Sequence, residues 1–126
     1  MDIVFFATKH NFSMNHVPFL LEKGIKVIDL SADFRFADPK LWKETYESDH
    51  KGPELLSSST YGLPEFNAIK IKESSLIAVP GCYPTASLLG LIPIAKYIKP
   101  QSKIILDVKS GISGAGRNAV EESLRD

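Results

Sequence analysis

Short apolar runs separated by turn residues dominate the pattern along this chain. Ile3–Ala7, Lys26–Leu30, Leu76–Val79 and Lys103–Val108 have the length and composition expected of strands. The first run contains two phenylalanines and no polar residue, which is typical of a central parallel strand buried on both faces. The pattern therefore predicts a sheet built from buried strands.

Cap and stop residues predict a helix between the first two strands. Ser13 or Asn15 is the expected cap, Pro18 falls in the first turn, and Gly24 is the expected stop. Strand, helix and strand over about thirty residues is the length of a right-handed crossover unit. We therefore expect a doubly wound, Rossmann-like parallel sheet in an α/β fold.

The middle of the chain is less regular. Pro39–Tyr46 is predicted to be a short helix capped by Asp38. Residues 47–60 have no period and are predicted to form a loop, and Tyr61–Glu65 is predicted to form a fixed turn. A helical turn over Ile69–Glu73 is expected before the third strand.

The single cysteine, Cys82, lies between the third predicted strand and a helix expected over Ala86–Tyr97. Pro84 suits the first helical position, which would place the thiol just outside the amino end of that helix. A thiolate is favoured there by the helix dipole, and Gly81 allows a ligand to approach closely. Isolated cysteines are also commonly small buried residues without chemistry, so the pattern leaves both roles open.

Polar residues follow the second and fourth predicted strands. Asp33 and Arg35 lie at a strand's carboxyl end, where open α/β sheets bind ligands, although a mutual ion pair or backbone hydrogen bonds would also explain them. Residues 109–117 are the richest in glycine and fit neither the Walker nor the dinucleotide fingerprint. A flexible turn is the alternative for that stretch.

Composition excludes several classes of protein. Fifteen basic residues balance fifteen acidic ones among 126, so no global field favours nucleic acid or an acidic membrane. One cysteine and no Cys/His cluster predict a reduced, cytoplasmic protein without a metal site. The longest apolar region, residues 86–95, is too short to cross a bilayer, and no secretory signal is evident.

Four motifs share one resemblance. Pro-Gly-Cys-Tyr-Pro-Thr-Ala at 80–86 resembles the nucleophile loop of N-acetyl-gamma-glutamyl-phosphate reductases, which are relatives of the aspartate-semialdehyde dehydrogenases. Val27–Arg35, Tyr61–Glu65 and Asp107–Arg117 match the same family in the same order. The resemblance covers nearly the whole chain, although Lys9 and Asn11 replace the usual Pro and Gly, and Val79 replaces an Asn.

The resemblance implies an NADP-dependent reductase of an acyl phosphate in arginine biosynthesis, with Cys82 as the catalytic nucleophile that forms a thioester. It also implies a small-molecule substrate and a homo-oligomer in the full-length enzyme. The cofactor-binding residues it suggests are Ser110, Gly111, Ser113, Gly114 and Gly116, and the substrate-binding residues are Asp33, Arg35 and Arg117. The family's catalytic histidine has no counterpart, because His10, His16 and His50 match no such motif.

The same resemblance predicts an internal fragment with two parts. Residues 1–81 correspond to the carboxyl-terminal part of the NAD(P)-binding domain, and 82–126 to the start of an α+β catalytic and dimerisation domain. We expect the isolated chain to be marginally stable or to aggregate, and to bind NADPH weakly at most.

Other functions remain open from the sequence. A reductase of the related amino-adipyl phosphate in lysine biosynthesis has nearly the same motifs. The departures at Lys9 and Val79 favour a non-catalytic remnant or an interaction fragment that supplies sheet edges to a partner. A Cys–His hydrolase is a third alternative, but no histidine motif accompanies the thiol.

Overall fold

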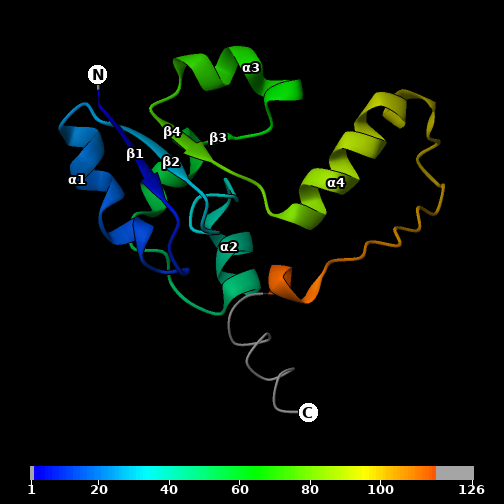
Figure 1. Ribbon diagram of the computed structural model, residues 1–126, viewed down its shortest axis with the longest axis horizontal. Helices are drawn as coiled ribbons and strands as arrows, with labels where there is room; N and C mark the ends of the chain where they lie inside the picture. The colour runs from blue at the N-terminus through cyan, green and yellow to red at the C-terminus, as the bar shows by residue number, and fades with distance from the viewer. Residues whose placement is uncertain (1, 116–126) are drawn as a thin grey trace. The chain divides into compact units, whose positions relative to one another are not determined.

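The computed structural model describes residues 2–115 and divides the chain into two compact units, residues 1–81 and 82–126 (Figure 1). The first unit contains a sheet of four parallel strands: β1 (Ile3–Phe6), β2 (Lys26–Asp29), β3 (Thr60–Tyr61) and β4 (Leu76–Ala78). Their order across the sheet is β1-β2-β4-β3. The predicted parallel α/β architecture is therefore confirmed.

Helical segments connect the strands, because parallel neighbours need crossover connections. The 3-10 helix η1 (Ser13–Asn15) and α1 (Val17–Glu22) join β1 to β2, and α1 packs against β2. α2 (Pro39–Tyr46) and the 3-10 helix η2 (Pro53–Ser58) follow β2, and α3 (Pro64–Glu73) joins β3 to β4.

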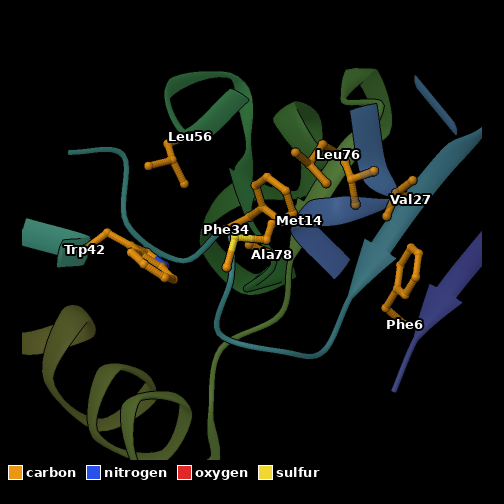
Figure 2. Close-up of a cluster of buried hydrophobic side chains, with 9 residues drawn as sticks. Phe6, Met14, Val27, Phe34, Trp42, Leu56, Leu76 and Ala78 are labelled. Atoms are coloured by element: carbon orange, nitrogen blue, oxygen red, sulfur yellow. The ribbon is translucent and has the colours of Figure 1, made fainter. Parts of the chain in front are cut away.

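The first unit has one buried apolar cluster, shown in Figure 2. Strands, helices and loops all contribute to it, so the cluster holds the connections against the sheet. Trp42 on α2 is fully buried, and its indole Nε1 has no hydrogen-bond partner in the structure. The members are Phe6, Met14, Val17, Val27, Phe34, Trp42, Leu56, Leu76 and Ala78.

A close backbone approach joins β3 to β4. A Cβ atom on Gly62 would lie 2.9 Å from Cγ2 of Ile77 and 3.2 Å from the carbonyl oxygen of Ala78. The Gly62 N–H donates to that same carbonyl oxygen at 2.8 Å. A side chain larger than hydrogen would therefore clash at this position. The segment predicted to be a fixed turn, Tyr61–Glu65, contains the last residue of β3 and the first two residues of α3.

Two predictions about the first connection were wrong. β1 pairs with β2 alone and leaves Phe5 65% exposed, so it is an edge strand of the described sheet. Its apolar composition allows burial on both faces, but a central position also needs a second neighbouring strand, which residues 2–115 do not supply. The cap of α1 is His16 without a side-chain bond, because the Ser13 hydroxyl is used inside the protein.

Other boundaries differ more modestly. The helix over Pro39–Tyr46 and its Asp38 cap are confirmed, with the Lys40 N–H donating to Asp38 Oδ1 at 2.8 Å. α3 is longer than the expected turn over 69–73, and η2 lies within the segment predicted to be loop. Short 3-10 turns have no apolar period, so the pattern did not reveal them.

The second unit contains α4 (Cys82–Leu91), followed by the 3-10 helices η3 (Ile92–Tyr97) and η4 (Ile112–Ala115). Pro93 lacks an N–H, which is consistent with the change from α-helix to 3-10 helix near that position. The predicted strand over Lys103–Val108 was wrong, since this segment pairs with no strand among the described residues and Ile105 is 92% exposed.

We expect Trp42→Ala to destabilise the first unit by about 3–5 kcal/mol, because it removes the largest fully buried side chain. Urea unfolding followed by far-ultraviolet circular dichroism measures the change. Leu41→Ala is the matched control on the same helix; Leu41 is 45% exposed, so its loss should change stability by about 0.5 kcal/mol or less. Equal losses for the two variants would contradict this packing.

Candidate functional site

The carboxyl ends of the four parallel strands share one edge of the sheet, which is where open α/β sheets bind ligands. Arg35 lies at this edge, in the loop after β2. Its Nε donates to the Val79 carbonyl and its Nη2 to the Leu30 carbonyl, each at 2.9 Å. These bonds use two of the five N–H groups of a guanidinium, so the others can bind an anion.

Tyr61 ends β3 at the same edge, and its side chain is half-buried. Burial raises the pKa of the Tyr61 hydroxyl, while the positive charge of Arg35 opposes that shift. The phenol therefore remains a neutral hydrogen-bond donor at physiological pH. The residue pattern around Tyr61 by itself predicts only a turn.

Asp33 lies in the same loop as Arg35 but is fully buried. Its Oδ1 accepts from the Asn11 N–H at 2.8 Å, and its Oδ2 accepts from the Met14 N–H at 3.1 Å and contacts the Ser13 hydroxyl at 2.9 Å. Both carboxyl oxygens of Asp33 thus accept hydrogen bonds from the segment between β1 and α1. Of the two structural alternatives to a ligand site, the described contacts show backbone hydrogen bonds.

The loop after β1 carries His10, whose Nδ1 accepts from the Ala32 N–H at 3.2 Å. That bond leaves Nε2 as the protonated nitrogen of the neutral ring. Asn11 has a φ of 65°, in the left-handed region that glycine adopts most easily and asparagine tolerates. Asn11 therefore holds a turn conformation that most other side chains would resist.

His50 is buried behind the same loop. Its Nδ1 accepts from the Gly52 N–H at 3.0 Å, so Nε2 is the nitrogen that donates to the Asp33 carbonyl at 2.9 Å. Burial lowers the pKa of the imidazole below 6.5, because the charged ring is poorly solvated there. His50 therefore supports the loop as a neutral side chain.

Cys82 is a free, exposed thiol and the first residue of α4. The prediction that it lies just outside the helix was wrong, because α4 begins two residues before Pro84. Proline is accepted there since the first four N–H groups of a helix have no partner within it. The thiol thus lies in the first turn, accessible to solvent and to small molecules.

A shallow, open apolar depression of about 670 Å³ lies within the second unit, and its lining includes Tyr83, the residue after Cys82. α4 forms one wall and the segment 106–108 forms the other. Its size is adequate for a small ligand, but its lining has few polar groups to fix an orientation. The lining residues are Tyr83, Pro84, Ser87, Leu88, Leu91, Leu106 and Val108.

The glycine-rich segment is exposed where the structure describes it. Ser110 Oγ donates to the Gly111 carbonyl at 2.9 Å, and Gly111 precedes η4, which contains Ser113 and Gly114. Lys109 and Asp107 form an exposed ion pair just before it. Gly116 and Arg117, which were also predicted to bind ligands, lie outside the described residues.

No group of three or more His, Cys, Asp or Glu side chains among the described residues could hold a metal ion. No helix among them is both long and apolar enough to cross a membrane.

Sequence reasoning missed three residues that organise the sheet edge: Ser13, Asp29 and His50. Ser13 was interpreted as a helix cap, and His50 was considered only as a catalytic residue. A usable signal was present in Asp29, Ser31 and Asp33, which alternate directly from the last residue of β2. Acidic and hydroxyl residues at the end of a buried strand indicate a polar network there.

Comparisons with known proteins agree along the chain. Residues 1–74 match the family model described as "Semialdehyde dehydrogenase, NAD binding domain". Residues 82–126 match the model described as "Semialdehyde dehydrogenase, dimerisation domain". The second match begins at Cys82, which is also the first residue of the second compact unit.

Curated relatives share about half of the aligned residues. A protein of Nitrosococcus oceani is 52% identical over 119 residues, covering 94% of this chain and 35% of its own length. One of Pseudomonas aeruginosa is 52% identical over 124 residues, covering 98% of this chain and 36% of its own. Both are named N-acetyl-gamma-glutamyl-phosphate reductase, which confirms the resemblance found from the sequence, and the chain spans about a third of their length.

We expect His50 to make stability depend on pH. Its folded pKa lies below the unfolded value of 6.5, so its contribution is present above pH 6.5 and is lost as pH falls through the folded pKa. Thermal unfolding between about pH 7 and pH 5 should show a fall in midpoint that His50→Asn reduces. His16→Asn, at an exposed histidine, should leave the fall unchanged; a profile that neither substitution alters would exclude His50 as its cause.

Proposed function

This chain belongs to the semialdehyde dehydrogenase family, and on that premise we propose that it supplies the nucleophile of an NADP-dependent N-acetyl-gamma-glutamyl-phosphate reductase of arginine biosynthesis. The observation that carries the proposal is the position of Cys82. This free thiol is exposed in the first turn of α4, and the loop before it follows directly from the carboxyl end of β4. A nucleophile needs such access to its substrate.

The chemistry assigned to Cys82 is acyl transfer followed by reduction. The thiolate Sγ attacks the acyl carbon of the substrate, the carbon–oxygen bond to phosphate breaks, and phosphate leaves with the electron pair. A nicotinamide cofactor, when bound, supplies the hydride that reduces the resulting thioester. Sγ then departs, takes up a proton, and releases the aldehyde.

The residues present fit an anionic dinucleotide. Within the second unit, the segment 110–114 offers backbone N–H groups and the Ser110 hydroxyl in an exposed position. Arginine and backbone N–H groups are the usual donors to phosphate oxygens. We assign cofactor contacts to Ser110, Gly111, Ser113 and Gly114, with Gly116 as the extension of the same segment.

Substrate binding is assigned first to Arg35. A free guanidinium edge pairs well with the carboxylate or phosphate of an acyl phosphate. Asp33 then acts as a positioning residue, because its oxygens hold the loop after β1. Arg117 remains a proposed substrate contact outside the described residues, and a homo-oligomer remains the proposed assembly of the whole enzyme.

A chimera tests the proposal: residues 1–126 replace the matching third of the Nitrosococcus oceani relative. Phosphate-dependent oxidation of N-acetylglutamate semialdehyde, followed as NADPH formation, should be measurable. Cys82→Ser should reduce its kcat by about a thousandfold or more, since a hydroxyl replaces the nucleophilic thiol.

A matched control moves the thiol instead of deleting it. Cys82→Ser combined with Ser57→Cys keeps one cysteine, at an exposed serine of the first unit, and should remain inactive. Activity that survives Cys82→Ser would overturn the nucleophile. Faster turnover of the amino-adipyl semialdehyde than of the N-acetylglutamyl one would favour the lysine-pathway alternative.

A further inference from the structure

A buried cluster of two carboxyl groups and two hydroxyls lies at the carboxyl end of β2. Asp29 and Asp33 are both fully buried, and Ser13 and Ser31 lie between them. Ser13 Oγ is 2.8 Å from Asp29 Oδ2, 2.9 Å from Asp33 Oδ2 and 3.1 Å from Ser31 Oγ. Ser31 Oγ is also 2.9 Å from Asp29 Oδ2.

The hydroxyl protons are too few for these contacts if both carboxyl groups are ionised. Ser13 carries one hydroxyl proton, yet its oxygen lies at hydrogen-bonding distance from a carboxylate oxygen on each side. Donating to one oxygen would leave its lone pairs facing the other without a proton between them. Two buried negative charges would also face each other across a single hydroxyl.

One added proton gives a donor to each of the three contacts between a hydroxyl and a carboxyl oxygen. We propose that Asp29 and Asp33 share a single proton, carried by Asp29, which donates to Ser13 Oγ while Ser13 donates to an ionised Asp33. Ser31 can then donate to Asp29 Oδ2. The pair carries one negative charge in place of two, the arrangement that closely spaced carboxyl groups adopt in other proteins.

The backbone decides which partner holds the proton. Asp33 accepts N–H groups on both oxygens, from Asn11 and from Met14, and an N–H can only donate. Asp29 accepts one backbone N–H, from Ser31 on Oδ1, so its Oδ2 is free to carry hydrogen. Burial, and secondarily the charge of Asp33, raises the pKa of Asp29 above 3.8, although hydrogen bonds from Ser31 and Ser13 oppose the shift.

Other titratable or charged groups contact this loop through its backbone. His10 accepts from the Ala32 N–H, His50 donates to the Asp33 carbonyl, and Arg35 donates to the Leu30 carbonyl. None of these three bonds goes to a carboxyl oxygen of the pair. The shared proton therefore links η1 to the loop after β2, which also contains Arg35. Loss of this proton at high pH would weaken the contact between η1 and that loop.

The sign of the pH dependence tests the proposal. A folded pKa above 3.8 gives a contribution to stability that is complete below pH 3.8 and is lost as pH rises through the folded value. Asp29→Asn replaces the protonated carboxyl group with an amide that does not titrate. As pH increases from about 4 to 8, the unsubstituted chain should lose stability that the variant keeps, so the urea midpoint of the variant minus that of the unsubstituted chain should rise. A difference that falls with pH would overturn the proposal, because an ionised Asp29 predicts that sign; a constant difference would overturn it as well.

Asp33→Asn is the matched comparison. Its amide would place an NH₂ group against the N–H of Asn11 or Met14, so its midpoint should fall below that of Asp29→Asn at neutral pH. The carbon-13 chemical shift of each carboxyl group, followed by NMR as a function of pH, measures protonation in the unsubstituted chain directly. The Asp29 carboxyl should titrate above pH 3.8, and an Asp29 that titrates at or below pH 3.8 would overturn the proposal.

Discussion

The hydroxyl of Ser13 lies between two buried carboxyl groups, and the loops at the edge of the sheet depend on that contact. A carboxylate removed from water is costly unless hydrogen bonds replace the lost solvation. Asp33 finds its donors in the loop after β1, and Asp29 finds its own in the loop after β2. Two connections distant in sequence are therefore held at fixed positions beside Arg35, which in turn binds the segment after β4.

Much of the first unit could be predicted from local patterns, because β1, β2 and β4 are apolar runs and cap or stop residues mark the helices between them; the two-residue strand β3 was not predicted. Asp38 before Pro39 marked α2 correctly, and Gly24, with a φ of 72°, marked the stop after α1. The edge position of β1 could not be read from Ile3–Phe6, since composition reports what a strand can bury and not how many neighbours it has. The segment 103–108 failed for the same reason, as a strand forms only with a partner.

The candidate site was only partly predictable. Cys82 and Arg35 could be proposed from the sequence alone, because a lone thiol after a predicted strand and a charge at a predicted strand end are both recognisable in the sequence. The network around Ser13 was not, since a serine near a helix start is also a normal cap and only the folded chain shows which partner it takes. His50 likewise shows its importance only through contacts with the Asp33 carbonyl and the Gly52 N–H.

The chain contains one tryptophan and one cysteine, and each lies in a different compact unit. Trp42 is enclosed in the apolar cluster of the first unit, whereas Cys82 is open to solvent at the start of the second. Indole emission therefore monitors order in residues 1–81 alone, and a dye attached to the sulfur monitors residues 82–126. The natural sequence thus provides one spectroscopic reporter for each unit, without the need to engineer either.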